Sequence, residues 1–189
     1  MRFFTSDLHF WHKNVIQFCN RPWSTVEEMN AGLIEIWNQT VTQNDDVFII
    51  GDMFFCGTAK LKEIMSQLNG NKYLIQGNHD WGVVKIHRAE EFGFKWVQRN
   101  QHCIRIGHED VYLCHFPYDE DHTAEVRYKE MRPVDIGNWL LHGHVHCAWK
   151  VRGRQINVGV DVWDWRPVSE VEIQKIIGTY HSTGIKGGL

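Results

Sequence analysis

The first part of the chain alternates short apolar runs with longer amphipathic segments. Each apolar run is followed by glycine or polar residues, which is typical of buried strands that end in loops. These runs occupy residues 2–6, 47–50 and 72–76. Between them, apolar residues recur at helical spacing over 25–42 and 58–68, and Ser24-Thr25-Val26-Glu27 fits a capping box before the first helix. The pattern therefore predicts a β-α-β-α-β order.

The second part has shorter apolar runs and more turn residues. After a predicted helix over 82–91, five further strands are expected. They occupy residues 95–98, 101–106, 111–114, 139–142 and 156–160. A hairpin tip at 150–154 favours antiparallel sheet in this part, residues 116–124 are predicted to be a polar and acidic surface loop, and a last helix is expected over 169–177.

Length and composition favour one ordinary globular domain. The chain has 189 residues, of which 43% are hydrophobic, and its formal net charge is −3. No linker interrupts residues 1–181, which we predict to form a single domain, and the glycine-rich residues 182–189 are expected to be a flexible tail. The apolar runs are too short to span a membrane, and the N-terminus lacks a signal-peptide core. We therefore expect a cytoplasmic protein that has no membrane partner.

Residues with metal-binding side chains follow one apolar run after another. They are Asp7, His9, Asp52, Asn78, His115, His144 and His146. Because the carboxyl ends of the strands in an open α/β sheet form the edge where ligands bind, we expect these side chains to lie close together. Gly51, Gly77 and Gly143 each precede one of them, and glycine permits sharp turns or close backbone approach.

The types of these residues indicate the kind of site. Carboxylate, imidazole and amide ligands without a thiolate favour Mn²⁺, Fe or Zn²⁺, and the five cysteines include no CxxC pair. The set is larger than one tetrahedral ion can use. It suits two ions about 3.5 to 4 Å apart that share a carboxylate, an arrangement used for in-line displacement at phosphorus.

The order of these residues resembles the signature blocks of the calcineurin-like metallophosphoesterase superfamily. The blocks are Asp7-Leu8-His9, Gly51-Asp52, Gly77-Asn78-His79-Asp80, His115 and Gly143-His144-Val145-His146. More narrowly, residues 10–14, 20–22 and 157–161 resemble the compact bacterial and phage phosphohydrolases of that superfamily. The resemblance spans most of the chain and implies an α/β fold, also classed as α+β, in which a four-layer α-β-β-α sandwich carries the site along one edge.

The resemblance also implies a division of the ligands between two divalent ions. One ion would be held by Asp7, His9, Asp52 and His146, and the other by Asp52, Asn78, His115 and His144. Asp52 would bridge them. Mn²⁺ is the preferred metal, with Fe, Zn²⁺ and Ni²⁺ as alternatives.

The same resemblance assigns catalytic roles to two adjacent residues. A hydroxide that bridges the metals would attack phosphorus in line. His79 would stabilise the phosphoryl oxygens and protonate the leaving alkoxide, while Asp80 would orient His79 and favour its imidazolium form. The apolar residues that follow Asp52 differ from the polar ones of many relatives, so the substrate contacts at that wall are left open.

Several other residues near the motifs have two readings. His12 could approach the site and Arg21 could bind a phosphate, or both could have surface or capping roles. We favour a structural role for His142. The tryptophans closest to the motifs could flank a nucleobase, although core positions are the simpler interpretation. They are Trp11, Trp81, Trp149, Trp163 and Trp165.

The predicted activity is hydrolysis of phosphodiester or phosphomonoester bonds. Because the net charge is −3 and an acidic run, residues 119–121, follows His115, long nucleic acid is disfavoured and a small phosphoester, nucleotide or cyclic nucleotide is preferred. The alternative is a non-catalytic interaction scaffold on the same fold. That alternative predicts loss of the metal ligands, whereas all of them are present in the sequence.

Overall fold

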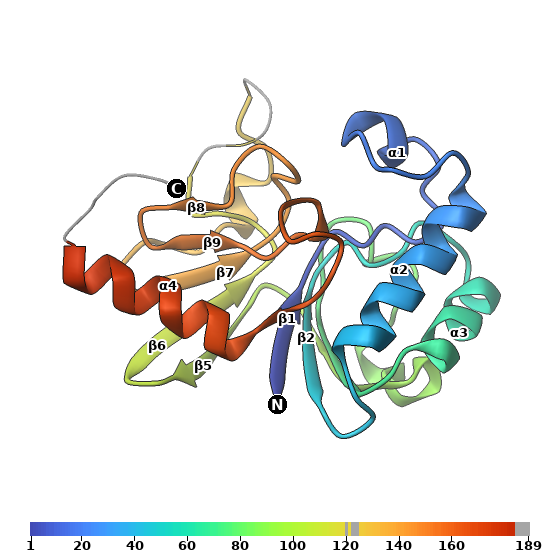
Figure 1. Ribbon diagram of the computed structural model, residues 1–189, viewed down its shortest axis with the longest axis horizontal. Helices are drawn as coiled ribbons and strands as arrows, with labels where there is room; N and C mark the ends of the chain where they lie inside the picture. The colour runs from blue at the N-terminus through green and yellow to red at the C-terminus, as the bar shows by residue number, and fades with distance from the viewer. Residues whose placement is uncertain (120, 122–124, 184–189) are drawn as a thin grey trace.

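The computed structural model describes residues 1–119, 121 and 125–183, and consists of two facing β-sheets with helices around them (Figure 1). The first sheet has the strand order β10-β1-β2-β3-β4. Its strands are β1 (Arg2–Thr5), β2 (Asp46–Ile50), β3 (Asn71–Ile75), β4 (Phe94–Gln98) and β10 (Val168–Ser169). The second sheet has the order β5-β6-β7-β9-β8. Its strands are β5 (Gln101–Ile106), β6 (Glu109–Cys114), β7 (Trp139–His142), β8 (Val151–Arg152) and β9 (Gln155–Asn157).

Helices cover the outer face of the first sheet and flank the second. The α-helices are α1 (Val15–Phe18), α2 (Val26–Thr40), α3 (Thr58–Gln67) and α4 (Glu170–Thr183). Short 3₁₀ helices are η1 (Ile86–Arg88), η2 (Glu90–Phe92), η3 (Lys129–Met131) and η4 (Val160–Val162). Figure 1 shows α2 and α3 on one side of β1 and β2, and α4 beside the second sheet. Within the described residues, no helix has both the length and the apolar character needed to cross a membrane.

Alternation along the central strands divides the core into two layers. Val47 and Ile49 of β2 pack with the residues of α2 and α3, whereas Phe48 and Ile50 belong to the cluster that faces the second sheet. This is the two-residue period of a strand that is buried on both faces. Ile173 and Ile177 of α4 join that second cluster. The predicted two-sheet α/β fold is therefore confirmed.

The parallel connections place the carboxyl ends of β1, β2 and β3 at one edge. β1 pairs in parallel with β2, and β2 with β3. In the second sheet, β6 pairs in parallel with β7, and β7 with β9. The second sheet is thus mixed. Among the described residues in the second part of the chain, the predicted antiparallel pairing is found for β5–β6, for β8–β9 and for β10 with β1.

Three further local predictions need correction. The helix expected over 82–91 is replaced by η1 and η2, and the β-branched Val83, Val84 and Ile86 in that segment disfavour a continuous helix. Strand β4 pairs in parallel with β3, so it belongs to the first sheet. The capping box lies one residue later than predicted, because Thr25 accepts the Glu28 N–H and the Glu28 side chain accepts the Thr25 N–H.

The C-terminal predictions are only partly within the described residues. Helix α4 continues to Thr183, beyond the predicted end at 177, so it includes the first residues of the expected tail. Residues 184–189 lie outside the described residues. All five cysteines are free, as their scattered positions predicted.

Candidate metal centre and catalytic site

The predicted ligands lie in the turns that follow β1, β2, β3, β6 and β7. Most of them have left-handed backbone conformations, which are rare for residues other than glycine. The φ angles are 54° at Asp7, 52° at His9, 50° at Asp52, 71° at His144 and 48° at His146. Each such conformation costs on the order of 1–3 kcal/mol, and such residues concentrate at functional sites. The backbone is thus strained at the positions of these predicted ligands.

Among the described residues, three groups of side chains bring their metal-binding atoms within 4.8 Å of one another. Two consist of predicted ligands, namely Asp7, His9 and His146, and Asp7, Asp52 and His115. The third, Cys19, His146 and Asp161, adds a thiol that the sequence analysis did not place near the site. Asp52 Oδ2 lies 3.3 Å from His115 Nε2 and 3.8 Å from His9 Nε2. Asp52 therefore faces histidines that come from different strand ends, as a carboxylate shared between two ions would.

Several buried polar atoms in this cluster fit a metal better than a hydrogen bond. Within the described part of the chain, both ring nitrogens of His9, Nε2 of His115 and Oδ1 of Asn78 are buried without a hydrogen-bond partner. Buried polar atoms are normally paired, and an unpaired one costs roughly 1–3 kcal/mol. Imidazole nitrogen and amide oxygen are ligand atoms for the metals named above, so the residues present fit a divalent ion.

The electrostatics of the cluster differ from one predicted ligand to the next. Burial lowers the pKa of His9, which keeps its ring neutral as a metal ligand must be. Burial alone would raise the pKa of Asp52, but the neighbouring His115 and His9 lower it and hold the carboxyl group ionised. Burial also opposes protonation of His115 and His146, but Asp52 raises the pKa of His115 to about 9 and Asp161 raises that of His146 to about 11. In the absence of a metal, His9 and Asp52 are therefore deprotonated at neutral pH, whereas His115 and His146 carry protons that a bound cation would displace.

Glycines allow the loops that carry the ligands to approach one another. A Cβ atom on Gly77 would overlap the Asp52 carboxylate, and a Cβ atom on Gly143 would overlap the Ser6 hydroxyl. At both positions any larger residue would displace a loop that carries a ligand. The sequence expectation of close backbone approach is met at both positions.

A buried ion pair between Arg21 and Asp161 contacts two of the predicted ligands, Asp7 and His146. Arg21 donates to Asp161 through Nε at 2.9 Å and through Nη2 at 3.0 Å, and Nη2 also donates to the Asp7 carbonyl oxygen at 2.7 Å. Both side chains are fully buried. Arg21 is therefore a structural residue, and the predicted phosphate-binding role is wrong. Asp161 Oδ2 in turn lies 3.5 Å from His146 Nδ1.

Asp80 binds the backbone of the strand-end loops, and among the described contacts of its carboxylate none is with the His79 ring. Its carboxylate accepts the N–H groups of Asp52 at 2.8 Å, Met53 at 3.1 Å and Gly77 at 2.9 Å. These bonds join the loops after β2 and β3. Because both carboxylate oxygens are occupied by these amides, Asp80 fixes the position of Asp52, and the predicted orientation of His79 by Asp80 needs correction.

His79 lies at the open side of the cluster. Its backbone N–H donates to Asp52 Oδ1 at 2.9 Å, and its Nε2 lies 3.9 Å from Asp52 Oδ2. The side chain is 36% exposed, and its ring contacts those of Phe55 and His12. A partly exposed imidazole beside the cluster can exchange protons with solvent and with a bound molecule.

The two other uncertain histidines differ in position. His12 lines the same cavity as the cluster, and its Nδ1 accepts the Val15 N–H at 3.0 Å. His142 is fully buried, with its ring against Trp149, and burial lowers its pKa to about 3. His142 is thus structural, as predicted, whereas His12 is placed where it could contact a substrate.

A buried carboxylate in the segment after β6 was missed by the sequence analysis. The Asp121 side chain is fully buried, lies 3.1 Å from His144 Nε2, and accepts a hydrogen bond from Arg132 Nη2 at 3.0 Å. The segment was predicted to be a polar surface loop. An acidic residue in a polar stretch gives no sign of whether it faces solvent or a buried arginine, so no local signal could have identified it.

The cluster opens into a cavity of about 320 Å³. Its lining includes His9, Asp52, Asn78, His79, His144 and His146, together with His12, Val15, Phe18, Arg127 and Tyr128. None of the five tryptophans considered as base-stacking residues is among these described lining residues. The cavity therefore combines the metal-type cluster with a partly aromatic wall from other residues.

Comparisons with known proteins agree with this arrangement. The family model of the calcineurin-like phosphoesterases matches residues 3–102. The Gene 66 protein of Mycobacterium phage L5 is 36% identical and covers 94% of this chain and 94% of its own length. An uncharacterized protein of Methanocaldococcus jannaschii is 34% identical, with 91% of this chain and 88% of that protein covered. A solved structure of a protein of unknown function from Aquifex aeolicus has a TM-score of 0.72 at 25% identity, covering 93% of this chain and 98% of that one.

The fold and the site define an α/β two-sheet protein with a candidate metal centre at its strand ends. The family model covers more than half of the chain and includes the turns after β1, β2 and β3. The chain belongs to the calcineurin-like phosphoesterase family. It is thereby a metal-dependent phosphoesterase in general terms, and the comparisons give no substrate.

Proposed function

We propose that the protein hydrolyses small phosphoesters with two divalent cations, preferably Mn²⁺. The observation that carries this proposal is the set of buried, unpaired ligand atoms that converge on one cavity from separate strand ends. One ion would be held by Asp7, His9, Asp52 and His146, and the other by Asp52, Asn78, His115 and His144. When bound, such ions supply Lewis acidity that makes water nucleophilic and offsets charge at phosphorus.

The chain's own residues would then orient and protonate the substrate. Asp80 holds the backbone of Asp52 in place through its amide bonds. His79, at the open side of the cavity, is suited to donate a hydrogen bond to a phosphoryl oxygen and a proton to the leaving oxygen. This geometry supports hydrolysis of either a monoester or a diester, since the proton is delivered to the leaving group in both.

The size and wall of the cavity favour a small substrate. A space of about 320 Å³ is at the lower end of ordinary ligand sites and suits a phosphoester or a nucleotide. Phe18 lines it and is 73% exposed, which provides an apolar surface for a planar leaving group such as a base. Extended nucleic acid is disfavoured by the net charge of −3.

A hydrolysis screen tests the proposal directly. The purified chain is assayed with Mn²⁺, Fe²⁺, Zn²⁺ and Ni²⁺ on p-nitrophenyl phosphate, bis-p-nitrophenyl phosphate, linear nucleotides and 2′,3′-cyclic nucleotides. We expect metal-dependent turnover that EDTA abolishes. If no substrate in the panel is hydrolysed, the enzyme proposal is wrong. Binding of fewer than one ion per chain after Mn²⁺ loading would favour the non-catalytic scaffold.

The role of His79 is tested by changing the leaving group. His79→Asn should retain both metals but lose most turnover on alkyl esters, whose leaving oxygen needs a proton. It should lose much less on p-nitrophenyl esters, whose leaving group departs as a stable anion. An equal loss on both substrate types would remove His79 from the general-acid role.

A further inference from the structure

Arg127 brings a permanent positive charge to the cavity wall. It comes from the segment between β6 and β7, and among the described lining residues it is the only arginine or lysine. Its side chain is 44% exposed. Since the predicted metal ligands provide no cationic group other than protonated histidine, Arg127 is the one protein cation in this wall that does not depend on pH.

One buried carboxylate connects Arg127 to a predicted metal ligand. Asp121 Oδ2 accepts the backbone N–H of Arg127 at 3.2 Å, and Oδ1 lies 3.8 Å from Arg127 Nη2. The same Oδ2 lies 3.1 Å from Nε2 of His144. The position of Arg127 and the orientation of the His144 ring are thus set by the same side chain.

Arg132 fixes that carboxylate in place. Its side chain is 5% exposed and donates to Asp121 Oδ2 at 3.0 Å, to the Pro117 carbonyl oxygen at 3.1 Å and to the Arg127 carbonyl oxygen at 3.0 Å. Arg132 makes the shorter ion pair with Asp121, and Arg127, whose side chain is 44% exposed, makes the longer one at 3.8 Å. Asp121 and Arg132 thus form a buried ion pair next to the partly exposed Arg127 side chain.

The contact between Asp121 and His144 also selects a ring nitrogen. When a carboxylate holds one nitrogen of an imidazole, the other nitrogen is the one that ligates a metal, and the carboxylate fixes the ring and raises its basicity. His144 would therefore ligate through Nδ1. Asp121 acts through His144 and Arg127, and it is a positioning residue for both.

We propose that Arg127 binds the phosphoryl oxygens of the substrate, and that Asp121 couples this phosphate contact to the metal-binding geometry of His144. The proposal rests on the phosphoesterase function and deepens it. A guanidinium can bind two oxygens of one phosphoryl group at once, so the group recognised is a phosphoryl with at least two unesterified oxygens, whatever the leaving group is. Arg127 thereby takes the role that the sequence suggested for Arg21.

The test measures phosphate binding separately from turnover. Orthophosphate is titrated into Mn²⁺-loaded wild type, Arg127→Ala, Arg127→Lys and Arg88→Ala by calorimetry, and KM and kcat are measured on p-nitrophenyl phosphate. Arg127→Ala should weaken orthophosphate binding and raise KM by about 10- to 100-fold with a smaller change in kcat. Arg127→Lys should recover part of the loss, and Arg88→Ala, a paired arginine outside this cavity, should match wild type.

The metal readout tests the part played by Asp121. Asp121→Asn should lower the affinity for Mn²⁺ by about 10-fold or more and also weaken orthophosphate binding, whereas Arg127→Ala should leave Mn²⁺ stoichiometry and affinity unchanged. Melting temperatures of the metal-free variants identify a folding defect, and Asp121→Ser, which also removes the charge, replaces Asp121→Asn if one is found. Unchanged Mn²⁺ affinity in a folded Asp121 variant would overturn the coupling.

Orthophosphate binding tests the role of Arg127, whereas turnover of the substrate panel tests the phosphoesterase function. If Arg127→Ala binds orthophosphate as wild type does, the phosphate contact is wrong even though the enzyme turns over substrate. If wild type hydrolyses nothing in the panel, the phosphoesterase proposal is wrong, and the calorimetry still reports whether Arg127 binds phosphate.

Discussion

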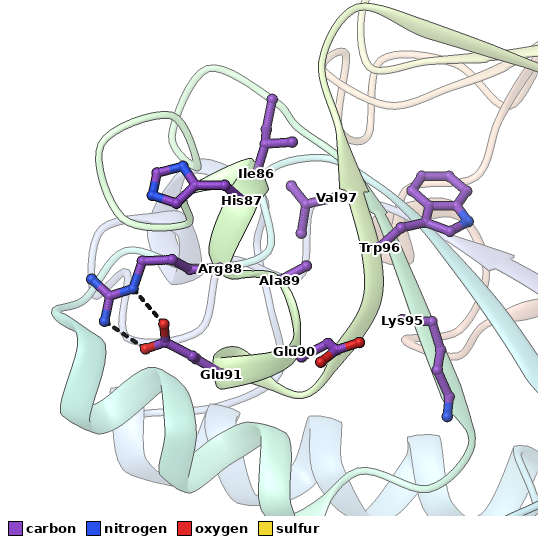
Figure 2. Close-up of a pocket in the computed structure, with 9 residues that line it drawn as sticks. All are labelled: Ile86, His87, Arg88, Ala89, Glu90, Glu91, Lys95, Trp96 and Val97. Carbon is purple, nitrogen blue, oxygen red and sulfur yellow. Dashed lines mark hydrogen bonds and ion pairs between the residues drawn. The ribbon is translucent and has the colours of Figure 1, made fainter.

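Two cavities of this molecule differ in what forms their walls. The larger, of about 510 Å³, lies beside η1, η2 and β4, and the described residues that line it all fall between Ile86 and Val97. Figure 2 shows its charged side chains, with Arg88 and Glu91 bonded to each other at 2.7 and 2.5 Å. The cavity of about 320 Å³ is lined by residues from His9 to His146, which come from the turns after separate strands.

The comparison shows that size does not identify the functional cavity. In the larger one, Arg88 pairs with its neighbour Glu91, and none of the described lining residues has a left-handed φ angle. In the smaller one, residues distant in sequence converge, several adopt left-handed φ angles, and buried ligand atoms are left without hydrogen bonds. A folded chain accepts such costs where a bound group can offset them. The larger cavity therefore supplies matched controls for each prediction below.

The largest effect is expected from Asp52→Asn. The change keeps the shape of the side chain but removes the charge that faces His9 and His115. Loss of a shared metal carboxylate should reduce kcat/KM by about 10³-fold or more, which corresponds to roughly 4 kcal/mol. Steady-state kinetics with Mn²⁺, together with metal analysis of the protein, measures both consequences.

Glu90→Gln is the control for this substitution. It removes a carboxylate from the larger cavity and should leave kcat/KM and metal content at wild-type values. Comparable losses in the two variants would show that the smaller cavity is not the site of the reaction.

A second prediction compares the two arginine–carboxylate pairs. Arg21→Met keeps much of the side-chain volume but leaves Asp161 buried without its partner. Breaking a buried pair on one side costs about 3–5 kcal/mol, whereas a pair such as Arg88–Glu91, whose side chains are each 48% exposed, contributes little. Denaturant unfolding of the metal-free proteins should show a large loss for Arg21→Met and no measurable change for Arg88→Ala.

The double variant Arg21→Met/Asp161→Asn extends this experiment. Removal of both charges should recover part of the stability lost in Arg21→Met, because the uncompensated carboxylate is gone. If the double variant is as unstable as the sum of the two single ones, the pair does not act as a unit.

The sequence predicted the elements around the smaller cavity because their signals are local. A buried strand appears as an apolar run, and the residue that follows it lies at the sheet edge, so Asp7, Asp52 and Asn78 could be placed together from the pattern alone. The structure brings these residues to one cavity or cluster. Their roles as metal ligands stay predictions.

The predictions that failed concern residues whose structure or role depends on contacts distant in sequence. Strand β4 pairs in parallel with β3, and nothing within its own five residues distinguishes this from pairing with the next strand. Arg21 lies in a segment of the family-like motif, but its role is decided by Asp161, which is 140 residues away. The position of Asp121 is similarly determined by its contacts with Arg132 and His144. Such partners cannot be read from local periodicity.

The smallest effect is expected from His12→Gln, compared with His87→Gln in the larger cavity. Burial lowers the pKa of His12, so its ring is neutral at pH 7, and because Nδ1 accepts the Val15 N–H, the proton is on Nε2. One neutral donor toward a phosphoryl oxygen contributes about 1 kcal/mol, so kcat/KM should fall roughly fivefold, mainly through KM. His87→Gln should change nothing. A loss of 100-fold or more in His12→Gln, or a change in its metal content, would contradict this prediction. His12 would then take part in metal binding or proton transfer, in addition to the histidines in the turns after the strands.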